Sequence, residues 1–246
     1  MSEQLLNHKI QNQWLRVIGI VLIASTLRAP LTSVGPVIDP IKQDLHINNG
    51  IAGLITTIPL IIFGMVSPFV ARILSRISMS QLLFMTLILT VISLVVRVSG
   101  GVSAFFIGTL FLGIAIALAN VTLPAYAKAS FPLQIGLITG IYSATMNFTA
   151  GLGGGLSFPL ASLSPLSYRL SLSFWIIFAI LALIVWLPQL KQNPHVSTQT
   201  GHGLKKPIYR SKMAWAVALT MAFQSMMFYS ICLLYTSDAA DERSSV

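Results

Sequence analysis

Charged residues are scarce in this chain of 246 residues: only 9% are Asp, Glu, Lys or Arg, whereas 55% are hydrophobic. Soluble domains carry about 25% charged residues, so this composition excludes an ordinary soluble fold. The formal net charge of +9 could indicate a nucleic acid partner, but the basic residues lie between apolar runs and are not clustered with aromatic side chains. The composition therefore predicts an integral protein of a lipid bilayer, with no nucleic acid partner.

Acidic residues are rarer still. Before position 232 the only acids are Glu3, Asp39 and Asp44, and all of them lie at or beyond the ends of apolar runs. The histidines fall in terminal or loop positions, and no paired carboxylates, phosphate-binding loop or metal-ligand spacing is present. These absences argue against a membrane-embedded enzyme, predict no cofactor or metal site, and leave no intramembrane proton relay in this part of the chain.

Cysteine occurs once, as Cys232, and it begins a stretch unlike the rest. Residues 232–236 and the serine after them can be reverse-translated as TGT CTC TTA TAC ACA TCT, which resembles the end of a sequencing-library adaptor. We therefore expect residues 232–246 to be an adaptor-derived artefact and the natural chain to be interrupted near Ile231. The alternative is a genuine acidic tail.

Long apolar runs fill most of what remains. Each is long enough to cross a hydrocarbon core of about 30 Å as a helix. The predicted spans are 17–38, 51–71, 77–96, 98–127, about 134–158, and 170–190, with a short polar loop at 39–44. A Pro-, Gly- and Lys-containing stretch follows, and then another apolar run. The predicted fold is all-α: a six-helix transmembrane domain over 1–190, a cytoplasmic linker over 191–212, and a partial seventh transmembrane helix over 213–231.

The distribution of Lys and Arg predicts the orientation, because cytoplasmic segments of membrane proteins carry an excess of both. With the N-terminus in the cytoplasm, the outer segments hold only Lys42, Arg97 and Arg169. The cytoplasmic segments then hold Lys9, Arg16, Arg72, Arg76, Lys128, Lys191, Lys205, Lys206, Arg210 and Lys212. This bias favours a cytoplasmic N-terminus.

Arg28 is the one charge within the first predicted span. A cation near mid-bilayer costs at least about 2.5–3.5 kcal/mol, so something must offset it. Pro30 and Pro36 predict a bend near Arg28, with Thr32 and Ser33 able to bond the carbonyl groups that the prolines leave open. A guanidinium presents a planar fork of donors, which suits a small anion. The alternative is a buried arginine bonded to neighbouring carbonyl groups.

Several motifs point to a family. They are Leu-Arg-Ala-Pro-Leu-Thr-Ser-Val-Gly-Pro at 27–36, Asp-Leu at 44–45, and the segments 52–59, 113–124 with Lys128, 139–147 and 224–229. With six spans, a basic linker and a further span, they resemble the major facilitator superfamily, in its cyanate and nitroimidazole transporter branch. Such transporters have two halves around a midplane site.

The resemblance implies the N-terminal half of a secondary transporter in the cytoplasmic (inner) membrane of a bacterium. Its partner would be a small anionic or polar solute, cyanate-like or nitroimidazole-like, moved by alternating access. The C-terminal half of the same chain would be missing. Two departures matter: the segment from Gly64 to Arg76 lacks the acid of the superfamily signature, and the fifth span lacks the Gly-Pro of antiporters. Charge-relay gating at that segment and exchange are therefore not supported.

Polar residues on several spans complete the candidate substrate-binding site. Its predicted members are Arg28, Thr32, Asn120, Tyr142, Asn147 and Gln224. For the uncharged members, hydrogen bonding between helices is an equally good explanation. The fifth span also carries small residues four or seven positions apart, which predict close helix packing, with a hinge as the second possibility. They are Gly136, Gly140, Ala144, Gly151 and Gly155.

Two further functions remain possible. The chain could be a non-transporting sensor or interaction protein, but a linker of about 20 residues is too short for a signalling domain, since domains run from about 50 residues. It could also be a non-functional truncation product, because half of the expected cavity would be absent.

Overall fold

The computed structural model describes residues 2–163 and 168–191 and, further on, positions 215, 216, 219, 220, 222–224, 226, 227 and 230. The chain divides into two compact units, Met1–Pro194 and His195–Val246. The predicted linker beyond Lys191 and the predicted artefact at 232–246 lie outside the described residues. Within the predicted seventh helix, the described positions are helical.

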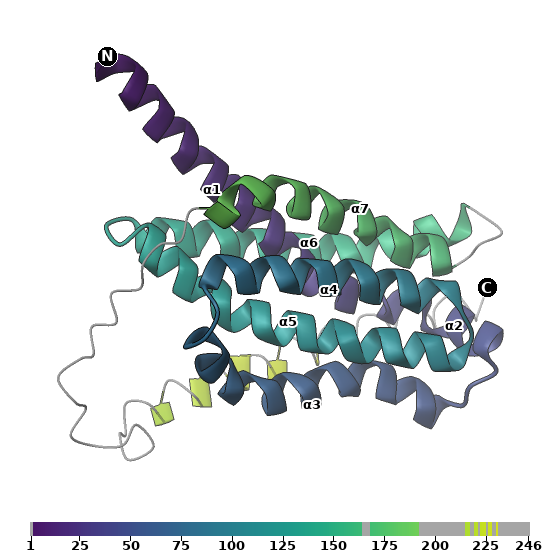
Figure 1. The fold of residues 1–246 in the computed structure, drawn as a ribbon. Helices are drawn as coiled ribbons and strands as arrows, with labels where there is room; N and C mark the ends of the chain where they lie inside the picture. The colour runs from purple at the N-terminus through teal and green to yellow at the C-terminus, as the bar shows by residue number, and fades with distance from the viewer. Residues whose placement is uncertain are drawn as a thin grey trace. The chain divides into compact units, whose positions relative to one another are not determined.

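Six long helices form the first unit in its described residues, as predicted (Figure 1). A short helix, α2, and two 3-10 turns, η1 and η2, complete it. In chain order the elements are α1 (Ser2–Thr32), η1 (Gly35–Val37), α2 (Ile38–Leu45), α3 (Asn49–Leu74), α4 (Met79–Ser99), α5 (Val102–Ser130), α6 (Ile135–Ser162), α7 (Tyr168–Trp186) and η2 (Leu187–Lys191).

Five stretches of the described chain are long and apolar enough to cross a membrane. They are Gln13–Leu45, Asn49–Leu74, Met79–Ser99, Val102–Ser130 and Tyr168–Leu190. The predicted span near 134–158 is not among them, because glycines, hydroxyl residues and Asn147 lower the hydropathy of α6. Its 28 residues nevertheless rise about 42 Å, which exceeds the hydrocarbon thickness of about 30 Å.

The predicted polar loop at 39–44 is wrong, because these residues belong to α2. Ile41 and Leu45 lie one turn apart and are buried in an apolar cluster, which outweighs the polarity of their neighbours. Lys42 forms an ion pair of 2.6 Å with Asp39 in the first turn of α2. His46 then ends the helix in a left-handed conformation, with φ 52°.

The interruption expected near Arg28 is present. α1 ends at Thr32, four residues further on, and Pro36 lies within the 3-10 turn η1. The Thr32 hydroxyl lies within hydrogen-bond distance of the Arg28 and Ala29 carbonyl oxygens, at 3.4 and 3.3 Å. These distances exceed that of a good O–H···O bond, so the predicted support of the last turn by this hydroxyl is weak.

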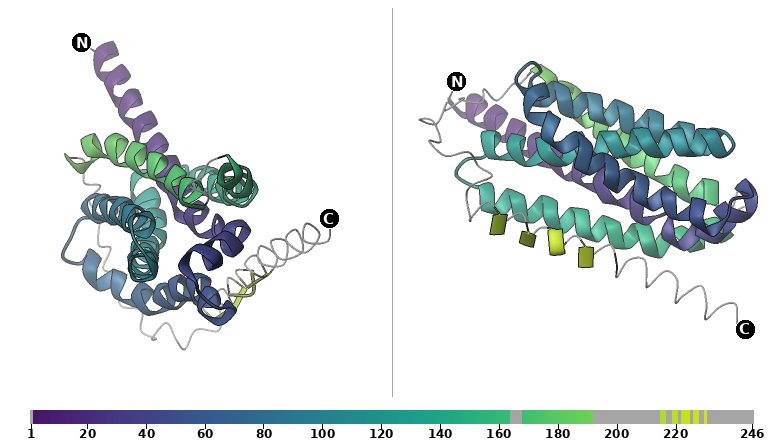
Figure 2. Two further views of the ribbon diagram at one scale, coloured as in Figure 1. Left: turned by 90° about the vertical axis from the view of Figure 1, so that its right-hand side faces the viewer. Right: turned by 90° about the horizontal axis from the view of Figure 1, so that it is seen from below.

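The helices pack in two groups that share contacts. α1 lies against α6 and α7, while α5 lies between α3 and α4, and α4 also contacts α7. Figure 2 shows this arrangement from two further sides. The first span is the most enclosed, with 67% of its most apolar window buried, against 17% for α3. The helix that carries Arg28 is therefore held from several directions.

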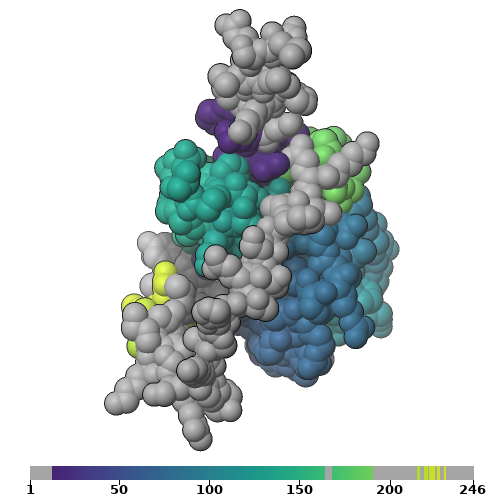
Figure 3. All heavy atoms as spheres, turned by 60° about the vertical axis from the view of Figure 1, so that its left-hand side comes forward, coloured from purple at the N-terminus to yellow at the C-terminus, as the bar shows by residue number. Residues whose placement is uncertain are grey.

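Alternate turns gather at opposite ends of the first unit. The α3–α4 and α5–α6 turns lie at the left end of Figure 1, whereas α2 lies at the right end. Figure 3 turns the left end forward, where parts of α3–α4 (blue) and α5–α6 (teal) are visible. Arg72 occupies the last turn of α3 and Lys128 the last turn of α5, so two of the cations predicted to be cytoplasmic lie at this end.

Candidate functional site

Arg28 and Asn147 meet between α1 and α6. The Arg28 Nη1 atom donates a hydrogen bond of 2.8 Å to the Asn147 Oδ1 atom. Arg28 is half-buried in the last complete turn of α1, and Asn147 is exposed near the midpoint of α6. The structure therefore brings together two of the predicted site residues, 119 positions apart in the sequence, and places their contact at the middle of a membrane-length helix.

A close approach of the two backbones makes this contact possible. A Cβ atom added at Gly153 of α6 would lie 2.6 Å from the Thr32 Oγ1 atom and 2.9 Å from the Ala29 carbonyl oxygen. The Thr32 hydroxyl donates to the carbonyl oxygen of Ala150 at 2.9 Å. Thr32 is only 5% exposed. Its hydroxyl therefore links α1 and α6, and its side chain is buried between the two helices.

Asn120 and Tyr142 are less closely connected to Arg28. Tyr142 packs against an apolar cluster that contains Leu27, Ala119 and Met146. Asn120 follows Ala119 on α5 and is half-buried. In residues 2–163 and 168–191, neither side chain takes part in a hydrogen bond. Tyr142 thus lies beside the cluster that contains Leu27, and neither residue has a polar link to Arg28 among the described residues.

Gln224 belongs to the second unit. It is helical and exposed there, and it stays a predicted member of the site that the first unit alone does not include. Among the described residues, no group of three or more His, Cys, Asp and Glu side chains could hold a metal ion.

Arg97 is the residue whose environment the sequence analysis missed. It was predicted among the outer cations and lies in the last turn of α4, but the burial of its side chain inside the bundle, at 1% exposed, was not predicted. Its Nη1 atom donates to the Pro30 carbonyl oxygen at 3.1 Å, and its Cζ atom lies 4.8 Å from the centre of the Phe105 ring. No local sequence signal identifies this burial, because it depends on the rotation of α4 about its axis.

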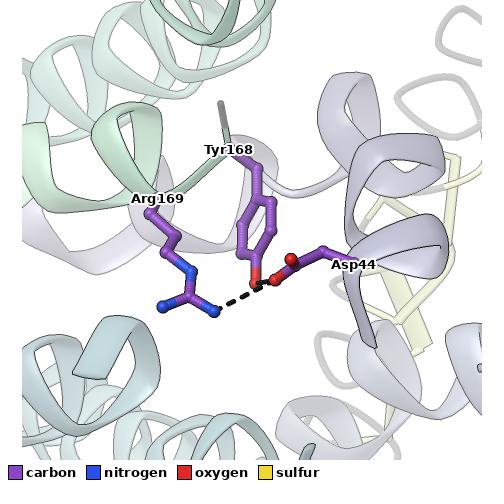
Figure 4. A network of polar contacts seen from close by, with 3 residues as sticks. All are labelled: Asp44, Tyr168 and Arg169. Carbon is purple, nitrogen blue, oxygen red and sulfur yellow. Dashed lines mark hydrogen bonds and ion pairs between the residues drawn. The ribbon is translucent and has the colours of Figure 1, made fainter. Parts of the chain in front are cut away.

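A second polar network, also missed, joins α2 to the start of α7 (Figure 4). The Asp44 Oδ2 atom accepts hydrogen bonds from the Tyr168 hydroxyl at 2.7 Å and from the Arg169 Nη2 atom at 3.0 Å. The Asp44 and Arg169 side chains are 48% and 37% exposed, so the ion pair is near the surface. The network holds the two segments together and is separate from Arg28 and Asn147.

The glycines predicted to pack closely do not do so inside this unit. An added Cβ atom at Gly136, Gly140, Gly151 or Gly155 would meet nothing within 4 Å. The close approach on α6 occurs at Gly153, outside the predicted spacing. The spacing does place these residues on one face of α6, but that face makes no close contact with the described residues of this unit at the four glycines.

Comparisons with known proteins all point to one family. The model of the Major Facilitator Superfamily matches residues 20–240. An uncharacterized transporter, YycB, of Bacillus subtilis (strain 168) is 38% identical over 224 residues, covering 91% of this chain and 55% of YycB. The 2-nitroimidazole transporter of Escherichia coli (strain K12) is 35% identical over 222 residues, covering 90% and 56%. The cyanate transport protein CynX of Escherichia coli (strain K12) is 25% identical, covering 87% and 61%.

Solved structures show a similar fold. A crystal structure of the peptide transporter POT in complex with sulfate has a TM-score of 0.59 at 14% sequence identity, covering 89% of this chain and 46% of that one. A complex of the same transporter with alafosfalin has a TM-score of 0.60. The chain thus spans little more than half the length of the curated relatives it matches.

Proposed function

Because this chain belongs to the major facilitator superfamily, we propose that it is the N-terminal half of a secondary active transporter for a small anionic or polar solute. The family consists of transporters and not enzymes. The chain is therefore a multi-pass membrane protein with a small-molecule solute. The observation that carries the finer proposal is the contact between Arg28 and Asn147 near the midpoint of α6.

Arg28 is proposed to bind the anionic part of the solute. Arginine carries its charge at any physiological pH and offers five N–H donors in a planar fork. Asn147 accepts one hydrogen bond from this fork but has no charge of its own. The amide therefore orients the guanidinium without cancelling its attraction for an anion.

The other predicted site residues take supporting roles in this proposal. Thr32 fixes the end of α1 on α6 through the Ala150 carbonyl oxygen. Tyr142 packs against the neighbouring apolar cluster, and Asn120 is half-buried on α5; both are proposed to shape the solute site. Gln224, which belongs to the second unit, is proposed to contribute an amide to the solute site of the whole transporter.

The names of two relatives suggest the chemistry of the solute. One relative is a 2-nitroimidazole transporter and the other a cyanate transport protein. Both compounds are small and carry their negative charge or polarity on a few atoms, which one guanidinium and a few amides can contact. A peptide-sized solute would need more donors and acceptors than the Arg28 region supplies. We therefore propose a solute of the cyanate or nitroimidazole size.

We also propose that the protein lies in the cytoplasmic membrane with its N-terminus inside. Arg72 and Lys128 lie in the last turns of α3 and α5, and both turns are at the same end of the first unit (Figure 3). An excess of cations at one end is typical of the cytoplasmic side.

The whole transporter would alternate between inward- and outward-open states as its two halves rock around this site. The family match extends to residue 240, so it does not mark a boundary at Ile231. Resequencing the gene across codons 231 and 232 tests the proposed interruption. A frame that continues into further apolar spans supports it, and genomic codons for 232–246 followed by a stop would contradict it.

Uptake of radiolabelled 2-nitroimidazole and of cyanate, each measured in cells that express the full-length protein, tests the role of Arg28. Hydrogen bonds to charged groups contribute about 1.5–3 kcal/mol, so Arg28→Ala should lower the apparent affinity about ten- to hundredfold. Asn147→Asp should be similarly harmful, because its carboxylate would pair with Arg28 in place of the solute.

Lys128→Ala is the matched control, because it removes one cation from an exposed position in the last turn of α5. It should leave uptake within about twofold of the original protein. Immunoblots of the membrane fraction would show that all variants are inserted to the same level. Normal uptake by the Arg28→Ala variant would refute the proposed site.

A further inference from the structure

Arg97 is fully enclosed, yet the described chain uses only part of its hydrogen-bonding capacity. The Nη1 atom donates to the Pro30 carbonyl oxygen at 3.1 Å. The Nε and Nη2 atoms are buried without a hydrogen-bond partner among the described residues. Neither of the two ion pairs of the described residues includes Arg97. The cation rests on the face of Phe105, at 4.8 Å from the ring centre.

The carbonyl group that Arg97 binds is one that the end of α1 leaves open. In a continuous helix the Pro30 carbonyl oxygen would accept the N–H of Val34. Here the Val34 N–H donates to the Leu31 carbonyl oxygen instead, at 3.4 Å, as the chain tightens into a 3-10 turn. Arg97 thus donates to a carbonyl oxygen that has lost its helical N–H partner, two residues after Arg28.

The last turn of α1 is consequently held from two sides. On the α6 side, Arg28 bonds Asn147 and Thr32 bonds the Ala150 carbonyl oxygen. On the α4 side, Arg97 bonds the Pro30 carbonyl oxygen. Gly108 fixes α4 in turn, because a Cβ atom there would lie 2.8 Å from the backbone nitrogen of Arg97. The position of Arg28 therefore depends on both sides.

We propose that Arg97 is a positioning residue for the anion site: it holds the end of α1 so that Arg28 presents its guanidinium toward Asn147. This inference rests on the proposed function of Arg28. Arg97 is 1% exposed and bonded to the Pro30 carbonyl oxygen, so in this proposal it acts through α1 and does not itself contact the solute.

Arg97 is costly to bury, and one hydrogen bond and one ring contact offset part of that cost. Arg97→Met removes the buried charge but leaves the Pro30 carbonyl oxygen without its partner, which is itself destabilising. Stability alone therefore does not separate a structural role from a positioning role. A positioning residue would lose its function in a variant that remains folded, and a purely structural residue would not.

The test compares Arg97→Met with Gln189→Met in the full-length protein. Gln189 is the matched control, because it is also buried and also donates to a backbone carbonyl group of α1, that of Leu15 at 3.0 Å. Leu15, however, lies several turns before Arg28. The readouts are KM and Vmax for uptake of 2-nitroimidazole and of cyanate, together with Tm in detergent. Arg97→Lys, which keeps a cation able to reach the Pro30 carbonyl oxygen, tests rescue.

We expect Arg97→Met to raise KM about tenfold and Arg97→Lys to restore most of the affinity. We expect Gln189→Met, which also leaves an α1 carbonyl oxygen without its donor, to leave KM within about twofold whatever its change in Tm. An unchanged KM in Arg97→Met, or equal changes of KM in both variants, would overturn the inference. If Arg28→Ala abolishes uptake while Arg97→Met leaves KM unchanged, this inference fails and the proposed function stands. Normal uptake by Arg28→Ala would refute the function itself.

Hydrogen–deuterium exchange on the 246-residue chain provides a readout that needs no solute. Arg97→Met should speed exchange over residues 28–38 and in the contacting part of α6, whereas Gln189→Met should act near Leu15. Unchanged exchange over 28–38 in Arg97→Met would show that Arg97 does not hold the end of α1.

Discussion

Gly153 allows the sharpest test of how α1 and α6 are joined. In Gly153→Ala the new methyl group would lie 2.6 Å from the Thr32 Oγ1 atom, 2.9 Å from the Ala29 carbonyl oxygen and 3.2 Å from the Ala29 Cα atom. Two of these atoms belong to the backbone, so a side-chain rotation cannot relieve the contact. α1 and α6 must move apart, and the bonds from Arg28 to Asn147 and from Thr32 to Ala150 must lengthen.

The magnitude follows from comparison with a neighbouring glycine. Overpacking costs about 1–3 kcal/mol, while an interior helical Gly→Ala substitution gains up to about 1 kcal/mol from helix propensity. An added methyl group at Gly154 meets nothing within 4 Å. Since the propensity gain is common to both variants, Gly153→Ala should be less stable than Gly154→Ala by the overpacking cost alone.

Thermal unfolding of the purified variants in one detergent measures this difference. For a unit of this size, 1 kcal/mol corresponds to roughly 2–4 °C, so Gly153→Ala should melt at least about 2 °C below Gly154→Ala. Its apparent affinity for the solute should fall as well, because Arg28 loses its position. Equal Tm values for the two variants would refute the close approach of α1 and α6.

Two further predictions concern the ends of helices. Asp44→Asn removes the ion pair with Arg169 but should cost at most about 1 kcal/mol, because both side chains are largely exposed; a larger loss in denaturant or thermal unfolding would show that the network with Tyr168 is cooperative. Ser78→Ala removes the reciprocal capping contacts with Gln81 at the start of α4 and should cost about 0.5–2 kcal/mol. Ser99→Ala, at the other end of α4, is its control in the same assay and should leave Tm unchanged.

The long helices and the depth of the site in the membrane could be predicted from the sequence, because both depend only on the position of a residue along the chain. Charges delimit the apolar runs, and the rise per residue places Arg28 and Asn147 at similar depths. The structure joins these two residues by a hydrogen bond. The sequence gives no rotation about the helix axis, however. Asn120 and Tyr142 were assigned to the same cavity as polar residues on later spans, and neither is bonded to Arg28 in the described residues.

The features that sequence reasoning missed depend on packing between distant segments. Arg97 ends an apolar run, which is also how a loop cation looks, and its burial depends on Gly108 of the next helix. The helix α2 was hidden among charged residues, and only the burial of Ile41 and Leu45 explains it. Gly153 likewise differs from the neighbouring glycines only in its close contact with α1. None of these properties can be read from local composition.

The bond between Arg28 and Asn147 also constrains how the protein is made. Ribosomes add about 5–20 residues per second, and 119 residues separate the two partners. Arg28 therefore leaves the ribosome about 6–24 s before Asn147. During this interval the first helix must be retained by the translocon or keep its arginine at the lipid headgroups. Synthesis rate and membrane integration are thus coupled at α1, and slowing translation between codons 28 and 147 should increase degradation of the nascent protein.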